Sequence, residues 1–218
     1  MKNILITGTN GMIGGLILQY CLQRDDVARI TSITRKPVGI SHPKLLEVLH
    51  CDFENFSSVE EHFTNQDICF FCIGVYTGQV SKQEFRRITV DVTRSFAECL
   101  HRNSPRSGFC FLSGQGADLS EKSWVMFARD KGIAENILIR LNFTQLAIFR
   151  PGYIYPVTPR TEPNRRYVFF RRIYPSLSKI FPGIGLRSEQ LAKAMIRVGF
   201  EGGSKNIYEN NEIKAVLT

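Results

Sequence analysis

The stretch from Lys2 to Leu18 constrains the fold of this chain more than any other. An apolar run, Ile4–Ile6, leads into the glycine-rich segment Gly8–Gly14, and an apolar-periodic segment begins at Met12. This order predicts a buried strand, a tight loop and the start of a helix. The spacing is G-x-x-G-x-x-G rather than the G-x-G-x-x-G of the commonest dinucleotide fingerprint, but the strand–loop–helix context is the one that such a fingerprint requires.

A loop of this kind is suited to a diphosphate. Its glycines allow a sharp turn, close approach of the backbone to an anion, and close packing of helix against strand. The first amides of the helix and the positive end of its dipole also attract an anion. We therefore expect a dinucleotide to be bound here, the contacting residues being Gly8, Asn10, Gly11, Met12, Ile13 and Gly14. The alternative is an ordinary strand–helix turn.

Strands and helices alternate along the chain as far as Arg150. The pattern predicts further strands at 29–34, 45–51, 68–73, 109–113 and 146–149, and helices at 12–24, 81–101 and 123–142. Such alternation predicts an α/β fold, a doubly wound parallel sheet of the Rossmann type with helices on both faces. We expect one domain over residues 1–218, with a core of about 1–152.

The C-terminal segment, about 153–218, has a different character. Prolines interrupt it, and arginines bracket an aromatic stretch at 165–172 before a helix that Ser188 is expected to cap and a short strand at 206–209. The basic aromatic stretch could contact nucleic acid or a membrane surface. We favour a lid over the substrate cleft, because the clefts of such sheets open on this side. Nucleic acid is disfavoured as a partner because a basic charge is a generic signal.

Composition narrows the class of protein. The net charge of +8 favours anionic partners, among them a phosphorylated cofactor. No apolar run is long enough for a membrane span, and the N-terminus does not resemble a signal peptide, so we expect a cytoplasmic protein. Cys69 and Cys72 have the spacing of a metal or redox pair, but side chains three apart on a strand point to opposite faces. We therefore expect no metal site. The oligomeric state is not indicated.

The end of the second predicted strand bears on the choice of cofactor. In a dinucleotide fold an acidic residue at this point would bind the ribose hydroxyls of adenosine. The chain instead has Arg35 and Lys36, two cations placed where a 2′-phosphate would lie. This predicts NADP(H) rather than NAD(H). The alternative is a solvated basic loop, since Lys and Arg are common on surfaces.

Two further strand ends carry candidate cofactor contacts. Asp52 and Phe53 follow the third strand and could meet the adenine, although Asp52 could equally be a turn residue. Gly74 follows the fourth strand and would let the backbone pass near the cofactor sugar, or would simply turn the chain. Pro151, after the sixth strand, lies at the same predicted edge.

The motifs together carry a resemblance. ITGTNGMIGG, CFFCIG, LSGQGAD, ARDKGIAE and FRPG, in this order, resemble the short-chain dehydrogenase/reductase superfamily in its atypical branch, and most of all the Tat-interacting-protein-like NAD(P)-binding group. The resemblance spans essentially the whole chain. It implies that Ser113 orients a substrate carbonyl and that Lys131 binds the nicotinamide ribose.

One departure from that family pattern concerns the proton donor. The tyrosine expected four residues before Lys131 is replaced by Phe127, whose ring has no proton to give. General acid catalysis is typically worth ~10²–10⁴ in rate, so the chemistry is in question while cofactor binding is not. The alternatives are that Lys131 is an exposed helix lysine paired with Glu135, that Ser113 is a turn residue, and that Tyr153 or Tyr155 replaces the missing hydroxyl.

Two functional hypotheses follow. The first is an NADP(H)-binding protein that reduces a small carbonyl compound, with Ser113 and Lys131 at its incomplete catalytic site. The second is a non-catalytic module, a cofactor-occupied sensor or scaffold that binds a protein partner. Phe127 is the residue that motivates the second hypothesis.

Overall fold

A parallel β-sheet forms the centre of the protein in the computed structural model, which describes residues 1–157 and 185–218. Its seven strands are ordered β3-β2-β1-β4-β5-β6-β9, and every neighbouring pair is parallel. The strands are β1 (Lys2–Thr7), β2 (Val27–Thr34), β3 (Leu45–Leu49), β4 (Ile68–Phe71), β5 (Gly108–Leu112), β6 (Gln145–Arg150) and β9 (Ile207–Glu209). A separate parallel pair is formed by β7 (Tyr153–Tyr155) and β8 (Gly185–Arg187).

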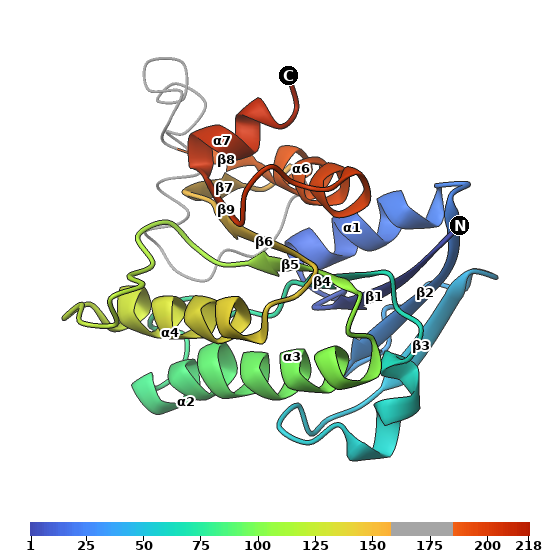
Figure 1. Cartoon of the computed structure of the whole chain (residues 1–218), viewed down its shortest axis with the longest axis horizontal. Coiled ribbons are helices and arrows are strands. Elements are labelled where there is room, and N and C mark those ends of the chain that lie inside the picture. The colour runs from blue at the N-terminus through green and yellow to red at the C-terminus, as the bar shows by residue number, and fades with distance from the viewer. Residues whose placement is uncertain (158–184) are drawn as a thin grey trace.

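Helices cover both faces of this sheet. They are α1 (Met12–Leu22), the 3₁₀ helix η1 (Ser57–Phe63), α2 (Lys82–Arg86), the π-helical turn η2 (Arg87–Asp91), α3 (Val92–Asn103), α4 (Met126–Leu141), α6 (Ser188–Glu201) and α7 (Asn210–Ala215). Figure 1 shows α1 and α6 on one side of the sheet and α3 and α4 on the other. The predicted doubly wound α/β fold is confirmed.

Alternation along the strands divides the apolar residues between two cores. Ile4 and Ile6 of β1 belong to the cluster under α1 and α6, whereas Leu5 between them belongs to the cluster under α3 and α4. Successive strand side chains point to opposite faces, which explains this division. Cys69 and Cys72 are likewise separated, Cys69 in the second cluster and Cys72 against the first.

The predicted elements differ from the observed ones mainly at their ends. The helix expected at 81–101 is present, capped by the Ser81 hydroxyl, but a π-helical turn at Arg87–Asp91 interrupts it. The expected cap at Ser188 is wrong, since Arg187 is the N-cap and Ser188 is the first, buried residue of α6. The β7–β8 pair and α7 were not predicted.

Part of the predicted lid lies outside the described residues. This is true of the basic aromatic stretch at 165–172 and of most prolines of the segment. Among the helices that are described, none has the length and apolar character needed to cross a membrane.

Candidate functional site

Two of the loop glycines are required by close backbone contacts. Gly8 has a φ of 74°, and a Cβ there would lie 2.6 Å from the carbonyl oxygen of Cys72, at the end of β4. A Cβ on Gly14 would lie 2.3 Å from the carbonyl oxygen of Gly8. The loop is therefore pressed against both the neighbouring strand and its own helix, in the arrangement that the glycine pattern predicts.

The start of α1 is positively polarised and carries no side-chain anion. Gly11 is its N-cap in an extended conformation, without a side-chain capping bond, and the first turn has no acidic residue. The Gly11 amide donates to the Gly8 carbonyl oxygen over 2.8 Å, which holds the loop closed. The next amides of the helix, from Met12 and Ile13, have no intrahelical acceptor and can bind an anion.

Asn10 joins this loop to the end of β2. Its side-chain amide donates to Thr34 Oγ1 over 2.9 Å and to the Lys36 carbonyl oxygen over 2.8 Å. These two hydrogen bonds fix the turn that carries Arg35 and Lys36, whose side chains are exposed. The Arg87 hydrogen bond lowers the pKa of Glu84, and the charge of Arg35 contributes in the same direction.

The other predicted cofactor contacts have mixed surroundings. Asp52 is exposed, and its Oδ1 accepts from the Glu54 amide over 3.1 Å, which is the geometry of a turn residue. Phe53 is only 8% exposed and packs edge-on against Phe56, so most of its ring belongs to the core. Gly74 is exposed, and a Cβ there would meet nothing within 4 Å, so the protein itself leaves space at this point.

Ser113, Lys131 and Phe127 lie around the end of β5. The Lys131 ammonium donates to the carbonyl oxygen of Leu112, the residue before Ser113, over 3.3 Å. The Phe127 ring packs on Gly114, the residue after Ser113. A Cβ on that glycine would be only 2.6 Å from Cζ of the ring. Cζ is the atom that would carry the hydroxyl of a tyrosine.

Lys131 is buried, so the alternative of an exposed helix lysine is wrong. Only 7% of the residue is exposed. Burial lowers the pKa of Lys131 to about 8, and the charge of Glu135 acts in the opposite direction. A buried ionisable group with a shifted pKa is a candidate functional residue.

A buried ionic network begins at Ser113. The Ser113 hydroxyl donates to Glu135 Oε1, and Arg150 Nε donates to both oxygens of that carboxylate over 3.0 and 3.1 Å. Arg150 also bonds Glu209, the last residue of β9, over 2.9 Å. Glu135 is fully buried, so its charge is compensated within the protein rather than by water.

Sequence reasoning missed this network. Glu135 was considered only as a surface partner of Lys131, and Arg150 only as a strand end. Two signals were available: Glu135 follows Lys131 by one helical turn and so shares its face, and Arg150 ends the strand next to β5. Pro151, beside it, is buried, and its carbonyl oxygen accepts from the Gln115 amide over 3.0 Å.

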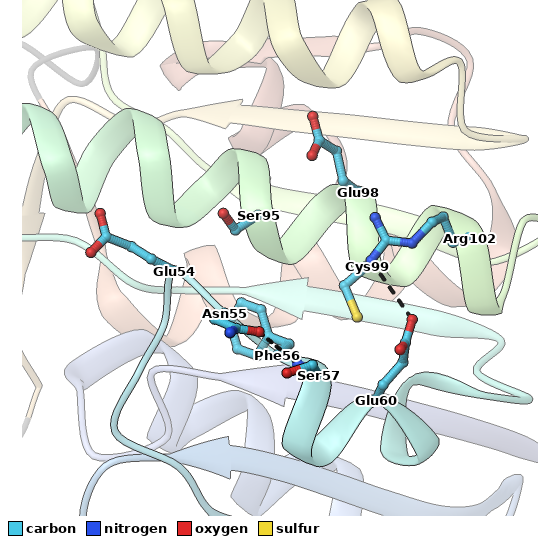
Figure 2. Close-up of a pocket in the computed structure, with 9 residues that line it drawn as sticks. All are labelled: Glu54, Asn55, Phe56, Ser57, Glu60, Ser95, Glu98, Cys99 and Arg102. Atoms are coloured by element: carbon cyan, nitrogen blue, oxygen red, sulfur yellow. Dashed lines mark hydrogen bonds and ion pairs between the residues drawn. The ribbon is translucent and has the colours of Figure 1, made fainter.

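A hollow of about 180 Å³ lies elsewhere, between η1 and α3 (Figure 2). It is lined by Glu54, Asn55, Phe56, Ser57, Glu60, Ser95, Glu98, Cys99 and Arg102. Arg102 and Glu60 form an ion pair across it, 3.7 Å apart. The hollow is smaller than the usual ligand pocket of about 300 Å³ or more, and no predicted site residue lines it.

The described residues contain no group of three or more His, Cys, Asp or Glu side chains that could hold a metal ion. The thiols near the sheet are also poorly suited to chemistry. Burial raises the pKa of Cys21 to about 12, and it raises that of Cys69 well above its usual range.

Curated relatives match almost the whole chain. Protein HTATIP2 from Rattus norvegicus is 26% identical in an alignment of 217 residues that covers 97% of this chain and 88% of that protein. Protein fmp52, mitochondrial, from Aspergillus clavatus is 26% identical over 234 residues, with coverage of 100% and 95%. The resemblance to the atypical branch of the short-chain dehydrogenase/reductase superfamily is confirmed.

Solved structures share the fold at low identity. The Bordetella bronchiseptica enzyme WbmH, solved in complex with NAD+, superposes with a TM-score of 0.70 at 17% identity, covering 96% of this chain and 75% of that one. UDP-N-acetylglucosamine 4-epimerase from Bacillus cereus also has a TM-score of 0.70, at 14% identity. The match covers 99% of this chain and 84% of that one. The model of one family matches residues 4–117, just over half of the chain, and this protein therefore belongs to the NAD dependent epimerase/dehydratase family.

Proposed function

We propose that this protein binds NADP(H), with the pyrophosphate on the loop Gly8–Gly14 and the 2′-phosphate beside Arg35 and Lys36. The observation that carries the proposal is the backbone cradle: a Cβ on Gly8 or Gly14 would collide with main-chain atoms, and the positive end of α1 opens onto the loop without an acidic residue. A relative in fold, WbmH, was solved with NAD+, which supports a dinucleotide of this type.

The nicotinamide end of the cofactor would lie at the end of β5, near Lys131 and Gly74. When bound, it would supply hydride exchange with a small carbonyl compound or the corresponding alcohol. Lys131 would bind the ribose through its ammonium group, which has donors beyond the one directed at Leu112. Ser113 directly precedes Gly114, which the Phe127 ring contacts, and so borders the same position.

The single tryptophan makes cofactor binding measurable. Trp124 is fully exposed and lies three residues before Phe127, so energy transfer from its fluorescence to a bound dihydronicotinamide reports binding. We expect NADPH to bind more tightly than NADH. Equal affinities, or no transfer with either, would contradict the proposal.

The cation pair can be tested in the same assay. Replacing both Arg35 and Lys36 by serine should weaken NADPH binding by about tenfold or more, since each charged hydrogen bond is worth ~1.5–3 kcal/mol, and should leave NADH nearly unchanged. The control is Arg94→Ser, an exposed arginine of α3. A similar loss for both cofactors would contradict the assignment of the 2′-phosphate.

A second candidate function is supported by Phe127. Without a proton donor at that position, the protein would act as a cofactor-occupied sensor or scaffold rather than a reductase. The Phe127→Tyr variant separates the two: its hydroxyl would start from the ring atom that faces Gly114, next to Ser113. Turnover of NADPH with a panel of carbonyl compounds only in the variant would establish the non-catalytic function, and turnover by the unmodified protein that Lys131→Ala abolishes would establish the reductase.

We propose a cytoplasmic location, with the mitochondrion as the alternative because the fungal relatives are named mitochondrial. Fractionation of cells producing the tagged protein decides between them.

A further inference from the structure

The proton of the Ser113 hydroxyl is already committed within the protein. Glu135 Oε1 accepts it, while Arg150, which can only donate, binds both oxygens of the same carboxylate. The Glu135 carboxylate therefore accepts from both Arg150 and Ser113, and Ser113 must be the donor in the Ser113–Glu135 hydrogen bond. A hydroxyl has one proton, so Ser113 keeps only its lone pairs for a ligand.

We infer that this site binds an alcohol in preference to the corresponding ketone or aldehyde, and that Glu135 is the positioning residue that sets this preference. The inference rests on the proposed function and specifies the ligand of the same site. It reverses the role that the family pattern implies for Ser113, which is to donate to a carbonyl. A carbonyl oxygen has no proton to offer, so it would face the lone pairs of Ser113.

Lys131 completes the match with an alcohol. Its ammonium has three protons: one is directed at the Leu112 carbonyl oxygen and one is assigned to the cofactor ribose, so one remains for a ligand oxygen. A hydroxyl group can accept from Lys131 and donate to Ser113 at once, whereas a carbonyl can do only the first. Phe127 adds no donor on its side of the site.

The network holds Ser113 firmly enough for this preference to persist when a ligand arrives. Glu135 is fully buried and the Arg150 side chain is 11% exposed, so water does not compete effectively for the carboxylate. For Ser113 to turn its proton toward a ligand, it would have to give up a bond to a buried charge. Hydrogen bonds to charged groups are the stronger kind, so this exchange is unfavourable.

The test uses matched pairs of probes: cyclohexanol with cyclohexanone, 1-phenylethanol with acetophenone, and 2-butanol with butanone. Competition within each pair is measured by saturation-transfer NMR on the full chain, with and without excess NADP+. We expect at least one pair in which the alcohol binds about fivefold more tightly, the effect of one ordinary net hydrogen bond. Ser113→Ala should bring that ratio close to one, and Ser113→Thr, which keeps the hydroxyl, should preserve it.

Two further variants separate positioning from general damage. In Glu135→Gln the amide can donate to Ser113, which frees the serine proton and should shift the ratio toward the ketone. Ser95→Ala, in the hollow of Figure 2, is the matched control and should change nothing. Ser113→Ala leaves Glu135 bonded to Arg150, so it remains informative if Glu135→Gln fails to fold.

Tighter binding of the ketone, a ratio that Ser113→Ala does not alter, or no probe whose binding depends on Ser113 would each overturn the inference. A Ser113→Ala variant that loses NADP+ affinity but shows no change with the probes would also overturn it, since the hydroxyl that Ser113 meets would then be that of the cofactor ribose. Failure of the proposed function is distinguishable, because it appears as no NADPH binding by Trp124 fluorescence whatever the probes do.

Discussion

The candidate site has two halves, one formed mainly by main-chain atoms and the other by side chains. The half around the loop Gly8–Gly14 consists of main-chain atoms: a positive φ, two contacts that exclude a Cβ, and the first amides of α1. The half around Ser113 and Lys131 consists of side chains contributed by β5, α4, β6 and β9. Main-chain geometry follows from glycine spacing, whereas the second half depends on residues far apart in the sequence.

In the function proposed above, this difference allows cofactor binding to be kept while the catalytic chemistry changes. A cradle of amides binds a phosphate whatever side chains surround it. A proton donor is a single group, and in the function proposed above Phe127 stands where a tyrosine would supply it. The first half can therefore persist while the chemistry of the second half changes.

The largest effect is expected from the buried charges of the second half. Arg150→Met leaves Glu135 buried without its cation, which should reduce the free energy of unfolding by about 3–5 kcal/mol. Arg102→Met is the control, because its pair with Glu60 is exposed and surface pairs are worth ~0–1 kcal/mol. Urea denaturation measures both, and comparable losses would show that the Glu135 network is not the stabilising element proposed here.

A smaller loss of stability is expected from a substitution in the glycine-loop half of the site. Gly14→Ala would push a Cβ to within 2.3 Å of the Gly8 carbonyl oxygen, a main-chain atom that cannot move freely. Overpacking of this kind costs about 1–3 kcal/mol, and displacement of the loop should also weaken NADPH binding. The control is Gly108→Ala, where the nearest atom is the flexible Gln145 side chain at 3.4 Å. If Gly14→Ala bound NADPH normally, the cradle would not be the cofactor site.

The same division separates what the sequence predicts from what it does not. The strands and helices along the chain and the glycine loop follow from periodicity and from residues adjacent in the chain, whereas the order of the strands in the sheet does not. The pairing of Glu135 with Arg150 requires knowing that β6 lies beside β5 and that α4 packs over both. Phe53 shows a related limit: its place after a strand suggested a ligand contact, but its burial depends on Phe56 and the core beneath it.

Replacing Lys131 should raise the free energy of unfolding, whereas the two preceding substitutions lower it. Burial lowers its pKa from 10.5 to about 8, so between these pH values the unfolded chain binds more protons than the folded protein. Stability from this group therefore rises as the pH increases through that window. Lys131→Met should be more stable than the unmodified protein at pH 7, by about 1–3 kcal/mol, although it binds NADPH less well.

Measurement at two pH values tests this sign. The advantage of Lys131→Met should shrink by pH 10, where the native lysine is neutral in the fold, and the exposed Lys82→Met should show no such trend. A variant that is less stable at pH 7 would mean that attraction to Glu135 outweighs the cost of burial.

The smallest change in stability is expected from two asparagines, one in each half, that make the same kind of hydrogen bonds. Asn10 donates twice from its side-chain amide, to Thr34 and to the Lys36 carbonyl oxygen. Asn136 of α4 also donates twice, to the Leu119 carbonyl oxygen and to Glu121, over 2.8 and 2.7 Å. Replacing either by alanine should cost about 1 kcal/mol of stability, since each loses two partly solvated bonds.

Their effects on the cofactor should nevertheless differ. Asn10→Ala frees the turn that carries Arg35 and Lys36, so it should weaken NADPH binding several-fold and NADH binding less. Asn136→Ala loosens the loop after β5, which does not carry the two cations, and should leave both affinities unchanged. If the two variants weakened NADPH equally, rigidity throughout the protein rather than the geometry of the first half would control its binding, and the distinction between the two halves would not hold.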